Sequence, residues 1–174
     1  MLTHLEARRL SLPLTTPYHL SFGDVTAYDT VLVRLVDHTG AEGIGEATVL
    51  TGYTDERIDE SWALARELVD ALTGADEAAA MARLQQLGPT APFLATAFAS
   101  AIEMLQGSAH LTLDRDVAVP VLGTVNDTEP DAMRAQIDAL IGRGYGTLKI
   151  KVGTDAPAEV ERYSLLHLVG DMVG

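Results

Sequence analysis

The sequence predicts an α+β domain followed by a truncated α/β segment. Three observations support this fold class. Apolar and polar residues alternate in the first part of the chain, as they do in half-buried antiparallel strands. Apolar residues then recur with helical spacing over residues 54–106, and from residue 117 the order becomes strand, helix, strand, helix. Because this last order is typical of parallel sheets, we expect the architecture to change near residue 110.

Three strands are expected within residues 1–49. They are "LEARRLSLPL", "YDTVLVRLVDHTG" and "AEGIGEATV", and the second places Val31 and Leu35 on one face. Between the first two lies "TTPYHLSFGDV", where Pro17 and Gly23 interrupt any regular pattern. We therefore predict an antiparallel sheet of three strands, with a mobile loop between the first two.

Three helices are expected to follow. Thr54 is a candidate N-cap for the first helix, which Gly74 ends. Asp76–Leu87 is predicted as the second helix, and the alanine-rich Ala91–Gln106, apolar on most sides, as a buried third. Two acidic pairs in the first helix suit its dipole and are predicted to face solvent. They are Asp55 with Glu56 and Asp59 with Glu60.

Two β/α units are predicted in the C-terminal part. "VAVPVLGTV" is a continuous apolar run, typical of a strand that is buried on both faces. "DTEPDAMRAQIDALIGRG" has the pattern of a capped amphipathic helix with a glycine stop. "GTLKIKV" is predicted as the next strand, and residues 157–169 as a further helix.

The composition limits the possible function classes. The 174 residues include no cysteine, so disulfides, thiolate metal sites and a cysteine nucleophile are excluded, and any metal would need oxygen or histidine ligands. A formal net charge of −13 argues against nucleic acid or an anionic membrane as partner. Because the sequence shows neither a run of about 18 apolar residues nor a secretory signal, we expect a cytoplasmic protein.

Two lysines alternate with apolar residues in "GTLKIKVG". If Leu148 and Ile150 pack under a helix, as outward residues of a parallel barrel do, Lys149 and Lys151 point inward. Burial and like-charge repulsion would lower a lysine pKa from its usual value of about 10.4, which would allow that lysine to act as a base. Alternatively, the lysines lie on the solvated face of an edge strand. The pattern alone leaves both interpretations open.

Other motifs carry less information. The glycines of "GIGEAT" and "GRGYG" do not complete a dinucleotide-binding fingerprint. The histidines show no metal-ligand spacing. One of them, His19, adjoins Tyr18 in the predicted loop and is a candidate substrate contact.

The order of these segments resembles the enolase superfamily, specifically its muconate lactonizing enzyme (mandelate racemase/muconate cycloisomerase) subgroup. "GIGEAT" is similar to the family's G-x-G-E-(A/G) strand, "AFASAIEML" to its A-x-x-A-(I/L)-(D/E)-M helix, and "GYGTLKIKVG" to its Lys-x-Lys segment. The resemblance implies a capping domain over residues 1–110, with a three-stranded antiparallel sheet plus helices. It implies a truncated TIM-barrel-type segment of two β/α units over residues 111–174.

The resemblance also implies a reaction. The family removes a proton α to a carboxylate, and Mg²⁺ stabilises the enediolate that forms. Lys151 matches the family's acid/base lysine, and Lys149 matches the lysine that helps to set the charge of its neighbour and of the substrate carboxylate. Residues 16–24 and 49–53 correspond to capping-domain loops that cover the substrate. The candidate substrate-binding residues are Tyr18, His19, Leu50 and Tyr53.

The chain departs from the family pattern in length. The family's metal-binding carboxylates belong to the third, fourth and fifth barrel strands, whereas only two β/α units fit here. We therefore expect a truncated or fragmentary member that is inactive by itself and binds no Mg²⁺ alone. Open strand edges favour a homo-oligomer, and a small-molecule carboxylate is the expected substrate once the barrel is completed. Two alternatives are a non-catalytic assembly module that keeps the capping fold, and a lysine that forms a Schiff base.

Overall fold

The structure is a computed structural model that divides into two compact units. The first comprises Met1–Pro17 and Asp24–Asp116, and the second the described residues of Tyr18–Gly23 and Val117–Gly174. Each unit is considered by itself below. The structure describes residues 1–20, 23–50, 52, 54–111, 114–127, 129–150 and 160.

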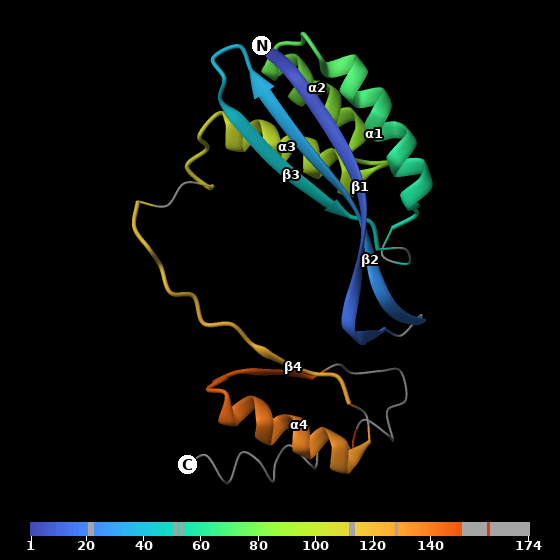
Figure 1. The fold of residues 1–174 in the computed structure, drawn as a ribbon, viewed down its shortest axis with the longest axis vertical. Helices are drawn as coiled ribbons and strands as arrows, with labels where there is room; N and C mark the ends of the chain where they lie inside the picture. Colours follow the sequence, from blue (N-terminus) through green and yellow to red (C-terminus); the bar gives the residue numbers. More distant parts are fainter. Residues whose placement is uncertain are drawn as a thin grey trace. The chain divides into compact units, whose positions relative to one another are not determined.

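A three-stranded sheet forms one layer of the first unit, apart from the strand ends within Tyr18–Gly23, which are grouped with the second unit. Its strands are β1 (Leu2–Leu20), β2 (Gly23–Asp37) and β3 (Glu42–Thr48), in the order β1-β2-β3 (Figure 1). β2 and β3 are antiparallel, and Arg34 pairs with Ile44 in their register. The predicted sheet is confirmed.

The hairpin between β1 and β2 is longer than the sequence predicted. The predicted mobile loop "TTPYHLSFGDV" is wrong, because β1 continues to Leu20 and β2 begins at Gly23. β1 is an edge strand, and an edge strand tolerates proline because its outward N–H groups need no partner in the sheet. Pro13 and Pro17 are four residues apart, so the period of two places both on the same side of β1.

Asp37 organises the turn between β2 and β3. Its Oδ1 accepts hydrogen bonds from the Thr39 N–H (2.8 Å), the Thr39 hydroxyl (2.7 Å) and the Ala41 N–H (3.0 Å). Gly40 has a φ of +86°, a conformation that glycine adopts without strain. The hydrogen bond from the Thr39 hydroxyl is the largest cause that lowers the pKa of Asp37 below its usual 3.8.

These hydrogen bonds predict a pH-dependent contribution to stability. Because the pKa of Asp37 is lower in the folded than in the unfolded chain, its stabilisation is present above pH 3.8 and is lost as the pH falls through the folded pKa. Asp37→Asn should therefore lower the urea midpoint at pH 7, and the difference from the unmodified chain should shrink near pH 3. The same loss at both pH values would contradict this. Asp55→Asn, at an exposed position, is the control.

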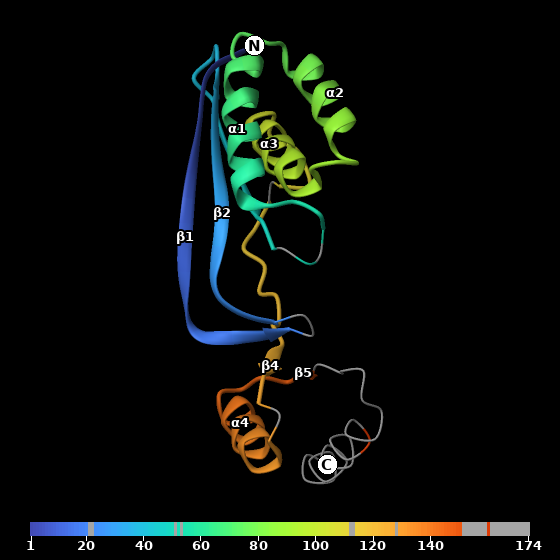
Figure 2. The same ribbon diagram turned by 90° about the vertical axis from the view of Figure 1, so that its right-hand side faces the viewer.

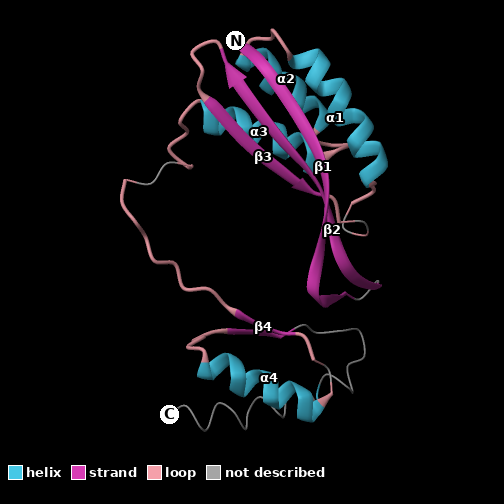
Figure 3. Ribbon diagram, in the orientation of Figure 1, coloured by secondary structure: helices cyan, strands magenta, loops and turns pink. Residues whose placement is uncertain are grey.

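Three helices cover one face of the sheet (Figures 2 and 3). They are α1 (Ile58–Leu72), α2 (Glu77–Leu87) and α3 (Pro92–Leu105), so the three predicted helices are confirmed. Asp76 caps α2 by accepting from the Ala78 N–H (3.0 Å). The core between the layers is built from alternate residues of β2 and from the inward faces of the helices. Its members include Val31, Val33, Leu35, Leu68, Leu72, Leu84, Phe98 and Ile102.

Two glycines of β3 bring α3 unusually close to the sheet. A Cβ placed on Gly45 would lie 1.8 Å from the carbonyl oxygen of Ala97, and one on Gly43 would lie 1.8 Å from that of Ala101. Real atoms do not approach so closely. The helix therefore rests directly on the strand backbone, which explains the glycines of "GIGEAT" without any ligand.

The start of α1 differs from the prediction. α1 begins at Ile58 after Arg57, whereas Thr54 lies upstream and its hydroxyl accepts from the Glu56 N–H (3.2 Å). Glu56 is buried, and its carboxylate accepts from the Phe93 N–H (2.7 Å), the Leu94 N–H (3.4 Å) and the Ser61 hydroxyl (3.4 Å). The predictions that Thr54 caps α1 and that Glu56 faces solvent are wrong. Glu56 instead caps α3, some 37 residues away in the chain.

The second unit contains a parallel strand pair and one described α-helix of several turns. The strands β4 (Gly123–Val125) and β5 (Leu148–Ile150) are joined through α4 (Pro130–Gly142), and Gly144, with a φ of +87°, ends the helix (Figure 3). The predicted order of strand, helix and strand in this part is confirmed. Its core packs α4 against the strands and consists of Val125, Met133, Ile137 and Leu140, with Tyr145, Leu148 and Ile150 at its border.

The strand predicted from "VAVPVLGTV" is mostly absent. Only its last three residues form β4, since only these pair with β5. The preceding apolar side chains are exposed, so the predicted burial on both faces is wrong. They are Val117, Val119, Val121 and Leu122.

Two further sequence predictions meet the limits of the described chain. The helix predicted over residues 157–169 lies outside the described residues, apart from residue 160. Within the described part of the chain, none of the helices has both the length and the apolar character needed to span a membrane.

Candidate active site

Lys149 lies at the centre of β5, opposite Thr124 of β4. Its neighbours Leu148 and Ile150 pack against the core that α4 forms, as the period-two pattern predicted. Lys149 alternates with them, lies on the other face of the strand pair and is exposed. Lys151 lies outside the described residues, so the arrangement of the two lysines stays a prediction.

These two residues are the only lysines of the chain. All other basic side chains, apart from histidines, are arginines. A lysine can lose its proton when its environment disfavours the charge, whereas an arginine remains charged in proteins. Proton transfer by an amine side chain is therefore confined to Lys149 and Lys151.

A polar cluster lies at the carboxyl end of β4. The side-chain oxygen Oε1 of Gln136, on α4, accepts from the Asn126 N–H (2.8 Å) and from the Asp127 N–H (3.1 Å). The side-chain oxygen Oδ1 of Asn126 is buried and has no hydrogen-bond partner among the residues that the structure describes. No sequence motif indicated these residues. The available signal was their position, because ligand sites of parallel α/β folds lie beyond the carboxyl ends of the strands.

The candidate substrate-binding residues fall in different parts of the chain. Tyr18 is half-buried near the end of β1 and belongs to the second unit, together with Lys149. His19 lies in β1, but its side chain and the whole of Tyr53 are outside the described residues. Leu50 follows β3, is half-buried and belongs to the first unit. The structure thus places Tyr18 and Lys149 in one unit and leaves the substrate role of all four residues as a prediction.

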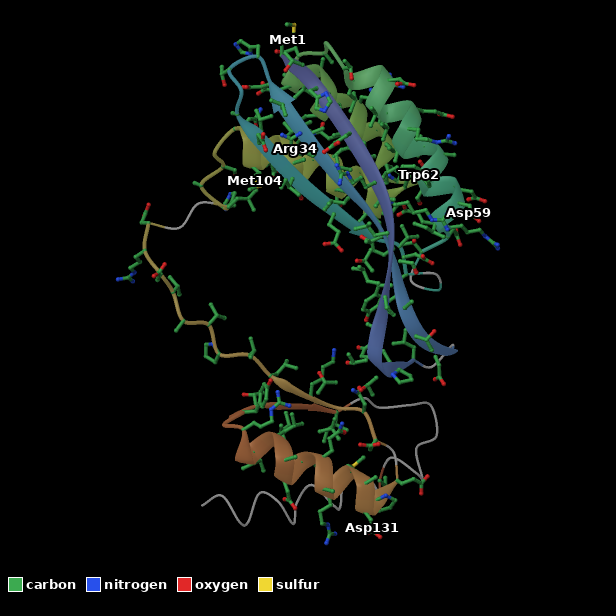
Figure 4. The ribbon with its side chains drawn as sticks, viewed as in Figure 1. Met1, Arg34, Asp59, Trp62, Met104 and Asp131 are labelled. Carbon is green, nitrogen blue, oxygen red and sulfur yellow. The ribbon has the colours of Figure 1, made fainter. Side chains whose placement is uncertain are left out.

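The sheet face opposite the helices carries an ion-pair cluster. Arg34, labelled in Figure 4, donates hydrogen bonds from two of its nitrogens to the two carboxylate oxygens of Glu42. Its Nη1 lies 3.7 Å from Oε1 of Glu6. The hydrogen bond from Arg34 lowers the pKa of Glu42. Exposed pairs of this kind contribute little to stability, and their charges already compensate one another. The open groove on this face is lined by Glu6, Arg8, Leu32, Arg34 and Ile44.

A metal site is not evident in the described part of the chain. Within those residues, no group of three or more histidine, aspartate or glutamate side chains could hold a metal ion. The described residues therefore do not fit a Mg²⁺ site.

Comparison with known families assigns the N-terminal part of the chain. Residues 4–110 match the family model of the mandelate racemase / muconate lactonizing enzyme N-terminal domain. The chain belongs to this family. The resemblance to the enolase superfamily is thereby confirmed, as is the fold class: a three-stranded antiparallel sheet plus helices, followed by a short parallel β/α segment.

Curated relatives are racemases and epimerases. The L-Lys-D/L-Arg epimerase of Desulforapulum autotrophicum is 29% identical over 167 residues, which cover 90% of this chain and 47% of the relative. The L-Ala-D/L-Glu epimerase of Bacillus subtilis is 30% identical over 170 residues, with 87% and 44% covered. The chain thus spans a little under half the length of these relatives.

Solved structures show the same fold. A dipeptide epimerase from Cytophaga hutchinsonii, complexed with Mg and the dipeptide D-Ala-L-Val, superposes with a TM-score of 0.83 at 24% identity, covering 94% of this chain and 47% of that one. The N-succinyl Arg/Lys racemase from Bacillus cereus gives a TM-score of 0.79 at 22% identity, with 94% and 47% covered. Mg²⁺ is thus present in a structure of this fold.

Proposed function

We propose that this chain supplies the capping domain and the first two β/α units of a racemase or epimerase that moves the proton α to a carboxylate. One observation carries the proposal: in a chain of this family, Lys149 faces away from α4 on the second parallel strand, and the next residue of that face in the sequence is Lys151. A small carboxylate such as a dipeptide or an N-acylamino acid is the proposed substrate class. The L-Ala-D/L-Glu epimerase is similar to this chain in sequence, and the N-succinyl Arg/Lys racemase is similar to it in fold.

The proposed roles follow the family resemblance. Lys151 is the acid/base on one face of the substrate, and Lys149 sets the charge of its neighbour and of the substrate carboxylate. Residues 1–110 form the capping domain, whose loops shape the pocket, and residues 111–174 begin the barrel. The proposed pocket residues are Tyr18, His19, Leu50 and Tyr53.

Mg²⁺ has no proposed ligands in this chain. In the family reaction the ion would stabilise negative charge on the substrate. The described residues offer no ligand group, and the family's metal carboxylates belong to later barrel strands. We therefore propose that the chain is inactive alone and gains activity when a further polypeptide segment completes the barrel.

Exchange of the α-proton tests this function. We incubate two proteins with L-Ala-L-Glu and Mg²⁺ in D₂O: the chain alone, and a chimera that carries the later barrel strands of the Bacillus subtilis relative. NMR measures the deuterium at the glutamyl α-carbon, which is the carbon next to a carboxylate. We expect no exchange with the chain alone and exchange with the chimera, and Lys151→Ala should slow exchange about 100-fold or more, as loss of a general base does.

The outcomes separate the alternatives. A folded chimera without exchange would favour the non-catalytic assembly module. Exchange that persists in Lys151→Ala would contradict the assigned base. Borohydride trapping of an aldehyde or ketone substrate on Lys149 or Lys151 would favour the Schiff-base alternative.

We also propose that copies of the chain associate through the exposed apolar segment before β4. Val119 is 72% exposed and Val121 is 67% exposed, and within the described residues β4 pairs only with β5. A second copy is the partner that a purified chain always meets. Sedimentation should detect association at micromolar concentration, and the double variant Val119→Asp, Val121→Asp should weaken it. A stable monomer, or equal weakening by Leu12→Asp on β1, would contradict this interface.

A further inference from the structure

The segment that follows β4 is fixed through its backbone. Gln136 Oε1 accepts from two successive N–H groups, those of Asn126 and Asp127, at 2.8 and 3.1 Å. Gln136 is half-buried on α4, one residue before the core residue Ile137. The backbone N–H groups of Asn126 and Asp127 therefore already have an acceptor, and that acceptor is not the Asn126 side chain.

The Asn126 side chain nevertheless contains a buried acceptor. Within the described part of the chain, its Oδ1 has no hydrogen-bond partner. An unsatisfied buried acceptor costs about 1–3 kcal/mol, and such groups are uncommon in native proteins. Such an oxygen, at the carboxyl end of a parallel strand, can accept a hydrogen bond from a side chain of the neighbouring strand that reaches it in another rotamer.

Lys149 is the cationic donor that the register brings near. Thr124 lies beside Lys149, and Asn126 is two residues beyond Thr124, directly after the end of β4. The period of two, continued by this one residue, places Asn126 on the same face as Thr124 and Lys149. Two residues of a strand span about 6.6 Å, a rise that the four-carbon stem of a lysine leaning along the strand can cover. Because the strands are parallel, that direction leads toward the carboxyl ends of both. Among the described residues, no hydrogen bond or ion pair holds Lys149 elsewhere.

We propose that Asn126 is a positioning residue for Lys149. Its Oδ1 accepts a proton of the Lys149 ammonium group and holds that group, charged, at the carboxyl end of β5. Gln136 holds Asn126 in turn. The importance of this contact for catalysis rests on the proposed function, since it would fix the positive charge that faces the substrate carboxylate.

The two lysines make a direct test possible. In the full chain labelled with ¹³C,¹⁵N-lysine, NMR gives one pair of Cε and Nζ signals for each lysine, and Lys149→Arg assigns them. We expect Asn126→Leu to lower the pKa of Lys149 by about half a unit or more, because the charged form loses its acceptor. Asn126→Asp should raise it, because a carboxylate accepts the same bond with an added charge. The shift should be smaller at Lys151.

Controls distinguish positioning from folding. Asp131→Asn, at an exposed position in the first turn of α4, removes a charge from the same unit and should leave the Lys149 pKa within error. If Asn126→Leu disrupts the fold by circular dichroism, Asn126→Asp and Asn126→Ser decide the question. An unchanged Lys149 pKa in the folded Asn126 variants, or a shift confined to Lys151, overturns the proposal.

The result is independent of the catalytic assay. A shifted Lys149 pKa with no α-proton exchange in the completed barrel would support the role of Asn126 and refute the proposed reaction. Exchange without the pKa shift would support the reaction and refute the role of Asn126.

Discussion

Gly45→Ala is expected to destabilise the first unit by about 3 kcal/mol or more, or to prevent its folding. The new methyl carbon would lie 1.8 Å from the Ala97 carbonyl oxygen, and that oxygen belongs to the helix backbone, which cannot turn away as a side chain can. α3 would have to move off the sheet, and with it Phe98 and Ile102 of the core. Overpacking of a tight core typically costs about 1–3 kcal/mol and occasionally more, and a clash with helix backbone cannot be relieved by a change of rotamer.

Urea unfolding followed by circular dichroism and by the fluorescence of Trp62, the single tryptophan, labelled on α1 in Figure 4, measures the effect. Gly43→Ala should behave like Gly45→Ala, because its Cβ would lie 1.8 Å from the Ala101 oxygen. Gly88→Ala is the matched control, since its Cβ would make only ordinary contacts, the nearest at 3.4 Å. An equal midpoint for Gly45→Ala and Gly88→Ala would show that α3 does not rest on the strand backbone.

These glycines belong to a part of the fold that local sequence patterns could not predict. The alternation of Val31 and Leu35 along β2 and the helical spacing of α3 are local patterns, and both elements were predicted correctly. The need for glycine on β3 depends on a helix that begins more than 40 residues later in the chain. A local sequence pattern carries no information about the close contact between β3 and α3.

In the segment before β4, the sequence predicted a longer strand than the structure contains. Its apolar residues indicated a buried strand, but burial and pairing need partners, and only Gly123–Val125 find one in β5. The apolar composition thus indicates that these side chains favour burial, whereas the described part of the chain contains no strand that pairs with them.

In the candidate site, too, one feature followed from the local sequence and another did not. The face of Lys149 followed from the alternation with Leu148 and Ile150, because a period of two is a property of the strand itself. The buried oxygen of Asn126 did not, because an unsatisfied acceptor is defined by all the atoms around it. Sequence reasoning therefore identified the lysines and missed the residue that we propose to hold one of them.

Adjacent acidic residues of the first unit have contrasting environments. The predicted first turn contained Asp55 and Glu56 as an exposed pair, yet the structure exposes Asp55 and buries Glu56. The Glu56 carboxylate lies at the N-terminus of α3, where backbone N–H groups lack partners within the helix and the dipole is positive. Ala91, the residue before α3, offers no side-chain cap of its own, which leaves this function to Glu56.

Glu56→Ala is accordingly expected to lower the free energy of unfolding by about 2–3 kcal/mol, since it removes charge-assisted hydrogen bonds and leaves the Phe93 and Leu94 N–H groups buried without an acceptor. Glu56→Gln, which keeps one carbonyl oxygen for Phe93, should lose less. Asp55→Ala, the exposed neighbour with the same charge, should change stability by less than about 0.5 kcal/mol. Urea titrations of the three variants at pH 7 give these values. Similar losses for Glu56→Ala and Asp55→Ala would mean that the buried carboxylate does not cap α3, and that net charge alone accounts for the effect.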